Sequence, residues 1–451
     1  MKRAMIAAAL ALAAGAVYWI DLKAQRIGFA MSKMVCSEMF VAGRSFEDLA
    51  ANDLPFLSPA TKHLSINIDE ATRSVSVSIF GLGKTEMSHH PVLGCADKTA
   101  RARLAAIPLD SSTVRPHAFE DVSERFPVTN KLVSSAMKDQ EQTRHRAIVV
   151  LYKGELVAEH YAPGFDASVR FWSHSMAKSV NATLLSIADQ QGLLSLDGGA
   201  LVPEWGANDK RSRITHRHLT DMASGLDFQE DYELFFGDFF EMMLAGDTGH
   251  FAAGLDLAHT PGERWFYSSA DSNLAARALA LALGQQGTST QAFAHRHLFA
   301  PLGITSAVLE FDTAGTFVGS SFMYATAMDW ARLGQAYLQN GQWQGQQIIP
   351  RAWVEGIQMP LASSAGTYRH GMWLNRQEPE GRWPNLPPDT FNFDGNQAQY
   401  VAVIPSMDIV IARLGQTQPK YWRDVRRFLG ELALSVTAEA APQDALARAR
   451  K

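Results

Sequence analysis

Residues 171–194 read FWSHSMAKSVNATLLSIADQQGLL, an aromatic lead-in followed by an apolar stretch. The apolar residues of this stretch recur at helical spacing, at Val180, Leu184, Leu185 and Ile187. No charged residue stands between Lys178 and Asp189. A surface helix would carry charges there, so we expect a helix that is buried in a core.

Ser175 and Lys178 are three positions apart at the start of this expected helix. Positions i and i+3 share a helix face, which brings the lysine amine within hydrogen-bond reach of the serine hydroxyl. Burial disfavours the charged form of an amine and makes it a usable proton acceptor. The backbone N–H groups of a helix N-terminus also favour the negative charge that develops in acyl transfer. The stretch therefore predicts a serine nucleophile, Ser175, with Lys178 as its base.

A serine and a lysine at this spacing arise by chance on the order of once in a chain of this length. Ser135 and Lys138 form such a pair. Residues 139–142, DQEQ, follow it and indicate a solvated turn with nothing to desolvate the lysine. We therefore expect the pair at Ser135 to be inert.

The chain has 451 residues, 47% of them hydrophobic, and can bury a sizeable core in two or three structural units. Its net charge of −5 comes with scattered basic residues, which argues against nucleic acid as a partner. We find no glycine-rich phosphate loop and no internal repeat, and we expect no cofactor.

Residues 1–20 differ from the rest of the chain. Lys2 and Arg3 precede an apolar run over residues 4–20, which is typical of an export signal, and Ala14-Gly15-Ala16 would serve as a cleavage site. The run continues past that site, so a single uncleaved membrane anchor is the alternative, and a buried soluble helix is a third. Either of the first two predicts a periplasmic or extracellular location.

Residues 21–125 predict a separate N-terminal extension. Residues 64–68 and 75–79 alternate apolar and polar residues around a polar turn, the pattern of a β-hairpin. Cys36 and Cys95 are the two cysteines of the chain. In an exported protein they predict a disulfide that closes a loop of about sixty residues, and two free buried thiols are the alternative.

Residues 126–435 predict the main domain, followed by a polar tail over residues 436–451. Strands are expected at 147–152, 156–161, 400–404 and 409–414, with helices at 272–283, 328–337, 351–358 and 421–434. Strands at both ends with helices between them predict a mixed sheet whose first and last strands meet, with an all-helical insertion.

Within residues 130–435, three short motifs follow one another: Ser175-x-x-Lys178, Tyr267-Ser268-Ser269 and Phe393-Asp394-Gly395. Their order and spacing resemble the serine β-lactamase and penicillin-recognising superfamily. Within it the chain looks most like the class C β-lactamase-like serine hydrolases, which include esterases, D-alanyl-D-alanine carboxypeptidases and 6-aminohexanoate-dimer hydrolase. The resemblance implies an α+β fold with an antiparallel sheet flanked by helices and an all-helical subdomain.

The resemblance also implies roles for the motif residues. Ser175 would be the acylated nucleophile, Lys178 its proton partner, and Tyr267 the group that carries protons to the leaving group. Ser269 replaces the asparagine common in the second motif, a change that resembles the amide-hydrolase branch, and we expect it to donate a hydrogen bond to substrate or to the lysine. In the third motif Gly395 keeps the close backbone approach, and the backbone N–H of Asn396 is expected to donate to the oxyanion beside that of Ser175.

Where the superfamily has a lysine or histidine in the third motif, this chain has Phe393. An apolar ring followed by the carboxylate of Asp394 offers no partner to the carboxylate of a penicillin or cephalosporin. We therefore expect an esterase or amidase with negligible β-lactamase activity. Arg369 or His370 could fold into the site and replace the missing cation.

Two other functional classes remain open. The histidine pairs 89/90, 216/218 and 295/297 could ligate zinc, but neither an HExxH helix nor a third ligand at a familiar spacing accompanies them, so we expect no metal. His174 is more consistent with a structural neighbour of the nucleophile than with its base. A non-catalytic envelope protein could also keep this fold and bind a small molecule. The sequence does not determine the natural substrate, which would be a small ester, amide or peptide, or the oligomeric state.

Overall fold

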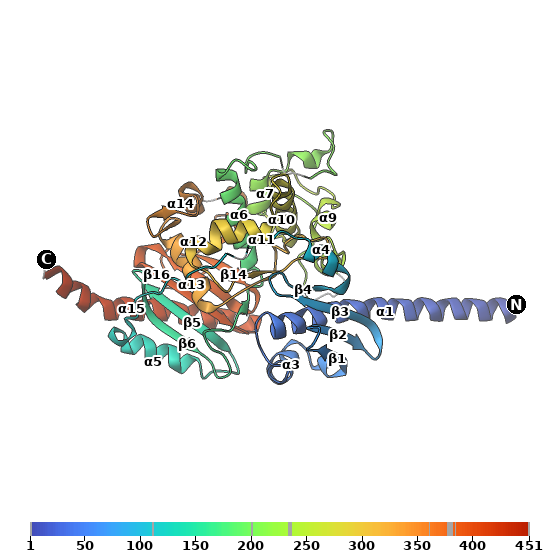
Figure 1. Cartoon of the computed structure of the whole chain (residues 1–451), viewed down its shortest axis with the longest axis horizontal. Coiled ribbons are helices and arrows are strands. Elements are labelled where there is room, and N and C mark those ends of the chain that lie inside the picture. The colour runs from blue at the N-terminus through green and yellow to red at the C-terminus, as the bar shows by residue number, and fades with distance from the viewer. Residues whose placement is uncertain are drawn as a thin grey trace. The chain divides into compact units, whose positions relative to one another are not determined.

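The computed structural model describes residues 2–110, 112–199, 202–232, 237–359, 361–376, 382–383 and 385–449. The chain divides into two compact units (Figure 1). Unit 1 comprises Met1–Ile107, Phe228–Thr248 and Glu310–Gly315. Unit 2 comprises Pro108–Asp227, Gly249–Leu309 and Thr316–Lys451. Unit 1 thus includes two segments from far along the chain, which no local pattern of residues 21–125 reveals.

Unit 1 is built on the long helix α1 (Lys2–Phe40) and a four-stranded antiparallel sheet. Its strands follow chain order: β1 (Leu64–Asp69), β2 (Ser74–Ile79), β3 (Leu82–His90) and β4 (Gly94–Asp97). The predicted hairpin is the β1–β2 pair, in which Ile68 lies opposite Val75. Short helices complete the unit: α2 (Phe46–Asp48), α3 (Leu54–Leu57), α4 (Arg101–Ala105) and α8 (Asp238–Leu244).

Helix α1 is held to the sheet covalently and by buried polar contacts. The predicted disulfide is present and joins Cys36 of α1 to Cys95 of β4. Glu310 lies between the same two elements, where its carboxylate is 3.0 Å from the amine of Lys33 and accepts hydrogen bonds from Ser37 and the backbone N–H of Cys95. This buried carboxylate explains why the segment Glu310–Gly315 belongs to unit 1.

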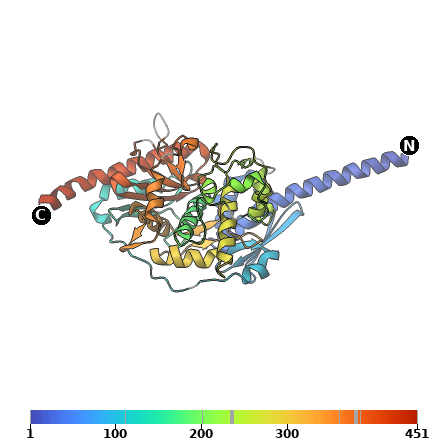
Figure 2. The same cartoon turned by 90° about the horizontal axis from the view of Figure 1, so that it is seen from above.

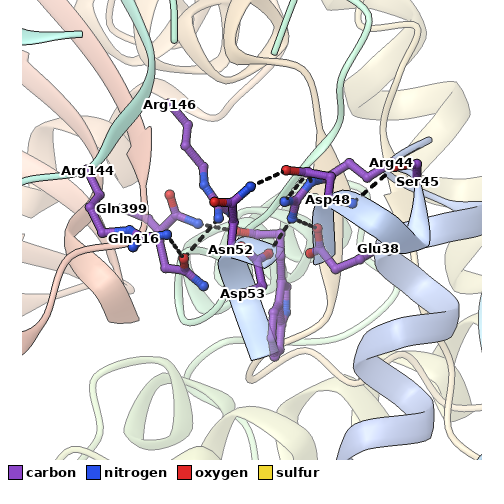
Figure 3. A network of polar contacts seen from close by, with 11 residues as sticks. Glu38, Arg44, Ser45, Asp48, Asn52, Asp53, Arg144, Arg146, Gln399 and Gln416 are labelled. Atoms are coloured by element: carbon purple, nitrogen blue, oxygen red, sulfur yellow. Dashed lines mark hydrogen bonds and ion pairs between the residues drawn. The ribbon is translucent and has the colours of Figure 1, made fainter. Parts of the chain in front are cut away.

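At the end of α1, Arg44 binds several carboxylates (Figure 3). Its guanidinium contacts Glu38 at 2.9 Å and also forms ion pairs with Asp48 and Asp53. These contacts tie the end of α1 to the short helices that follow it. Residues 2–20, expected to be an export signal or an anchor, begin α1. Within the described residues, no helix carries enough apolar length to span a bilayer.

The described residues of unit 2 form a seven-stranded sheet in the order β12-β13-β14-β15-β16-β5-β6. The strands are β12 (Tyr368–Arg369), β13 (Met372–Leu374), β14 (Phe391–Gly395), β15 (Gln399–Ile404), β16 (Ile409–Gly415), β5 (His145–Tyr152) and β6 (Glu155–Tyr161). The first and last strands of the domain meet as predicted, because β16 pairs with β5. The sheet is antiparallel rather than mixed, because every neighbouring pair of its strands runs in opposite directions.

Helices pack on both faces of this sheet (Figure 2, in which α15 is the long red helix). The helices α5 (Pro127–Ala136) and α15 (Trp422–Ala449) share a core with β5, β15 and β16, which includes Val133, Ile148, Ala402, Ile411 and Val425. Helix α13 (Ala327–Leu338) covers the opposite face. A Cβ on its Gly334 would lie 2.7 Å from Val401, so only glycine permits this approach. The predicted α+β architecture is confirmed, and α15 continues to Ala449, through most of the expected tail.

Unit 2 contains further helices. The two long ones are α6 (Met176–Gln190) and α10 (Ser269–Gly284). The shorter ones are α7 (His216–Thr220), α9 (Thr248–Ala253), α11 (Thr290–Ala294), α12 (Ala300–Leu302) and α14 (Arg351–Ile357). A small sheet of β7 (Phe171–Trp172), β9 (Met323–Ala325) and β8 (Val308–Leu309) leads the chain into α6, and β10 (Gln342–Trp343) pairs with β11 (Gln346–Gln347).

Candidate active site

Helix α6 places Ser175 and Lys178 together. Its residues 176–188 are all buried, as the uncharged run predicts. Ser175 is the N-cap residue but makes no side-chain capping bond, so its hydroxyl does not accept a hydrogen bond from the backbone of the helix that it begins. The comparison pair behaves as expected, because Ser135 and Lys138 are both exposed at the end of α5.

Lys178 is only 2% exposed and its amine lies among oxygen atoms. The Nζ atom is 3.1 Å from Oγ of Ser175, 3.1 Å from Oγ of Ser269 and 2.8 Å from the backbone oxygen of Ser320. The carbonyl oxygen can only accept a hydrogen bond, so the amine donates to it. The nucleophile candidate and its expected base are therefore in direct contact.

The start of α10 supplies Ser269. Ser268 caps this helix by accepting a hydrogen bond from the backbone N–H of Asp271. Asp271 is buried and accepts a hydrogen bond of 2.6 Å from the hydroxyl of Ser224, which fixes the first turn of the helix. Ser269 is fully buried, and its hydroxyl oxygen accepts a hydrogen bond of 3.1 Å from the amine of Lys178, the reverse of the expected direction.

Tyr267 stands just before this cap. The amine of Lys178 lies 4.8 Å from the centre of the tyrosine ring. The ring packs against Trp373 at 5.3 Å and against Tyr368 at 6.0 Å, so the β12–β13 hairpin holds it in place. The structure thus brings together all three residues that the sequence assigned to proton transfer.

The third motif ends strand β14. A Cβ on Gly395 would lie 2.4 Å from the backbone oxygen of Ser173 and 3.4 Å from the Cβ of His174. Glycine is therefore required because the strand passes close to the residues that precede Ser175. Asn396 follows the strand, is exposed, and accepts a hydrogen bond from the backbone N–H of Gln397 through its own side chain.

Phe393 does not line the site, and the expectation that it governs specificity is wrong. Its ring is fully buried and packs against Tyr337 at 5.4 Å and Trp330 at 6.5 Å, both on α13. Alternate residues of a strand point to opposite faces, and Phe393 shares the face of β14 that α13 covers. The sequence pattern did not reveal what covers that face.

Neither of the two cations expected as replacements occupies the site. Arg369 forms an ion pair of 3.0 Å with Asp221. His370 is buried, stacks on Trp353 at 4.0 Å, and donates its backbone N–H to Asp221. Burial, together with the neighbouring arginine Arg369, lowers the pKa of His370 to about 3, so its ring is neutral.

A second cation near Tyr267, beyond Lys178, is Arg382, which sequence reasoning missed. Its guanidinium lies 4.0 Å over the ring of Trp373, which in turn packs against Tyr267. One nitrogen of Arg382 lies 2.5 Å from the carboxylate of Asp394. Arg382 belongs to no motif and stands in a loop between β13 and β14, so no spacing pattern could have found it.

His174 is a structural neighbour of the nucleophile. Its ring lies 3.9 Å from that of Trp172. Burial lowers the pKa of His174 to about 3, so the ring stays neutral at ordinary pH, and it is a poor proton acceptor. Members of two other histidine pairs form hydrogen bonds within the protein, His216 with the backbone oxygen of Ser195 and His297 with the side chain of Gln191. In the described part of the chain, no three His, Cys, Asp or Glu side chains are grouped to hold a metal ion.

A family model described as Beta-lactamase matches residues 130–434. The chain belongs to the Beta-lactamase family. This membership places the protein broadly among serine hydrolases and confirms the superfamily that the three motifs resemble. No curated protein matches the chain.

Solved structures of other Beta-lactamase-like proteins share the fold. A Bacillus anthracis protein provisionally named a 6-aminohexanoate-dimer hydrolase is 19% identical, with a TM-score of 0.58 over 74% of this chain and 90% of its own. A family VIII carboxylesterase is 15% identical, with a TM-score of 0.53 over 70% and 98%. A penicillin-binding protein homologue from Caulobacter crescentus is 16% identical, with a TM-score of 0.53 over 73% and 99%. At these identities the likeness concerns the fold.

Proposed function

We propose that the protein cleaves a small ester, amide or peptide bond through an acyl-enzyme on Ser175, with Lys178 and Tyr267 transferring protons. The observation that carries this proposal is the 3.1 Å distance between the amine of Lys178 and the hydroxyl of Ser175, made by a lysine that is only 2% exposed. A binding protein has no need of a desolvated amine beside a serine hydroxyl.

In the acylation step, Oγ of Ser175 attacks the carbonyl carbon of the substrate and its proton passes to Nζ of Lys178. A neutral amine has two hydrogens and a lone pair. The two hydrogens can be donated to the oxygens of Ser320 and Ser269, which leaves the lone pair for the proton of Ser175. The backbone N–H groups of Ser175 and Asn396 are the proposed donors to the oxyanion.

In the same reaction, the hydroxyl of Tyr267 donates a proton to the leaving alkoxide or amine. The resulting phenolate is stabilised by the ammonium of Lys178, which lies next to the ring. Water then attacks the acyl-enzyme and gives one proton to the phenolate of Tyr267, while the ammonium of Lys178 returns its proton to Oγ of Ser175 as the acid is released.

For the substrate, we propose a neutral ester or amide rather than a β-lactam. The carboxylate of Asp394 compensates the charge of Arg382 at 2.5 Å, so the pair offers no free cation to the carboxylate of a penicillin or cephalosporin. The preference for neutral esters or amides over β-lactams therefore depends on the Asp394–Arg382 pair and not on Phe393.

Labelling with a fluorophosphonate probe tests the proposed nucleophile. We expect stoichiometric labelling of the wild-type protein, none of Ser175→Ala, and full labelling of Ser135→Ala, the matched variant of the exposed pair. Peptide mass mapping should place the adduct on Ser175. A folded wild-type protein that neither labels nor hydrolyses p-nitrophenyl butyrate would support a non-catalytic envelope binding protein instead.

We also propose that the chain is exported and works in the periplasm or outside the cell. The basic start and apolar run of residues 2–20 support this, as does a disulfide, which persists in oxidising compartments. Cell fractionation tests it. Recovery of the protein from the cytosol with two free thiols would contradict the proposal.

A further inference from the structure

Arg413, in strand β16, is fully buried and uses its whole guanidinium. It donates hydrogen bonds to the ring nitrogen Nδ1 of His145 at 3.0 Å and to the backbone oxygens of Gln397 at 3.1 Å and Ala398 at 2.7 Å. Two further bonds go to the backbone oxygen of Thr143 at 2.5 Å and to the hydroxyl of Thr417 at 2.7 Å.

Among the described residues, none of these partners of Arg413 is a carboxylate. Burial accordingly lowers the pKa of Arg413 to about 9, which still leaves it charged at pH 7. A buried charge without a counter-ion opposes folding, so packing alone does not explain the residue. The backbone also makes room for it, because a Cβ on Gly415 would lie 2.4 Å from the guanidinium.

Two of the oxygens that Arg413 binds belong to a strained turn. Gln397 has φ 64° and ψ 25°, and Ala398 has φ 60°, so two consecutive residues with side chains adopt the left-handed conformation. Such residues persist where the surrounding structure holds them, and they concentrate at functional sites. One nitrogen of Arg413 bridges the carbonyl oxygens of both.

This turn includes Asn396 and directly follows Gly395, which ends strand β14 beside the nucleophile. Gln399 lies on the other side of the turn (labelled in Figure 3). Its side-chain amide donates a hydrogen bond of 2.7 Å to the backbone oxygen of Trp172 and accepts one of 2.8 Å from the backbone N–H of Gly415. The turn is therefore fixed between the chain that enters α6 at Ser175 and the strand that carries Arg413.

We propose that Arg413 is a positioning residue for acyl transfer, which holds the turn at residues 396–398 so that the backbone N–H of Asn396 faces the carbonyl oxygen of a substrate at Ser175. The inference rests on the proposed acyl-enzyme function and assigns a role to a residue outside its three motifs. A displacement of about 1 Å in a reacting group lowers rates by about 100-fold, so a loosened turn should slow acylation.

The test compares Arg413→Lys with the wild-type protein at 25 °C. Lysine keeps the charge but cannot bridge two carbonyl oxygens and reach the other partners. We expect the single-turnover acylation rate with p-nitrophenyl butyrate to fall by about 10-fold to 100-fold, while the concentration that half-saturates this rate changes less than about 3-fold. Amide hydrogen exchange over residues 396–399 should become faster in this variant.

Arg332→Lys is the matched control, because Arg332 is also buried but pairs with Asp329 and binds the backbone oxygen of His117, away from the site residues. It should leave acylation within about 2-fold of the wild-type rate. If Arg413→Lys is unfolded at 25 °C, Thr417→Val decides, since it removes one partner of Arg413, and it should slow acylation at least about 3-fold. Wild-type acylation in the deciding variant, or equal slowing in both arginine variants, would overturn the proposal. A wild-type protein that is not acylated would instead refute the proposed function.

Discussion

The amine nitrogen of Lys178 lies 3.1 Å from the hydroxyl oxygen of Ser269, which stands 91 residues further along the chain. The contact joins the N-terminal ends of α6 and α10. Because both residues are buried, the amine is held between the two helices with little water to solvate a charge. The arrangement leads to specific expectations for the chemistry and for the stability of the protein.

Replacing Lys178 with methionine keeps a side chain of similar length and removes the proposed base. We expect kcat/KM for p-nitrophenyl butyrate to fall by about 100-fold to 10,000-fold, the usual contribution of general-base catalysis. The measurement is steady-state hydrolysis at pH 7. Lys138→Met, in the exposed pair, should retain wild-type activity, and a comparable loss in that control would argue against a specific role for Lys178.

Replacing Tyr267 with phenylalanine removes the proposed proton donor to the leaving group. p-Nitrophenolate leaves without a proton, whereas the amine released from an anilide needs one. The loss of kcat/KM should therefore be at least about 10-fold larger for a p-nitroanilide than for the matched p-nitrophenyl ester. Equal losses on the two substrates would show that Tyr267 does not protonate the leaving group. Tyr232→Phe, at an exposed tyrosine, serves as the control.

Charge compensation by Asp394 predicts substrate preference. The wild-type protein should hydrolyse p-nitrophenyl butyrate about 10-fold to 100-fold more efficiently than a chromogenic cephalosporin, because a charge-assisted contact worth about 1.5–3 kcal/mol is missing. Asp394→Asn frees the charge of Arg382 and should raise cephalosporin efficiency relative to the ester by about 5-fold or more. Asp408→Asn, at an exposed turn, should change neither. An unchanged ratio in Asp394→Asn would show that the ion pair does not set the preference.

Two buried histidines predict a loss of stability in acid. The pKa of His174 and that of His370 are each lowered to about 3 by burial, while an unfolded histidine titrates near 6.5. Below pH 6.5 the unfolded chain binds more protons than the folded one, so stability falls from pH 6.5 towards pH 3, by about 2 kcal/mol per histidine at pH 5. Urea unfolding at pH 7 and pH 5 measures this difference.

The histidine contribution can be isolated with variants. His174→Asn should reduce the acid-induced loss, since asparagine tolerates the left-handed backbone at this position (φ 46°) and does not titrate. The same change at the exposed His250 should not reduce it. Identical pH dependence in the wild-type protein and in His174→Asn would contradict the assignment.

The disulfide between Cys36 and Cys95 should stabilise unit 1. Closing a loop of about sixty residues contributes about 3–4 kcal/mol, so the double variant Cys36→Ser, Cys95→Ser should unfold at a lower urea concentration. Because both cysteines belong to unit 1 and the residues proposed for catalysis belong to unit 2, esterase activity below the unfolding transition should stay at the wild-type level. Equal urea midpoints for the two proteins would contradict a stabilising role.

Local patterns in the sequence were enough to predict several parts of this protein. Helical spacing and the missing charges after Lys178 predicted a buried helix with Ser175 at its start, an apolar run that turns at Lys153-Gly154 predicted β5 and β6, and alternation predicted β15 and β16. The order of the motifs was enough to identify the superfamily, because each motif is a short run of neighbouring residues. The residues that follow each pair also predicted that Lys178 is buried and Lys138 is exposed.

The surroundings of these elements became known from the folded chain alone. Phe393 belongs to the core because α13 covers its face of β14, and a second positive charge near Tyr267 comes from Arg382, in a loop without a motif. Unit 1 recruits Glu310 from far along the chain, and Arg413 reaches a turn that precedes it in sequence and lies beside it only in the folded sheet. Such contacts join residues distant in sequence, so they depend on how the helices and strands pack and leave no periodic trace along the chain.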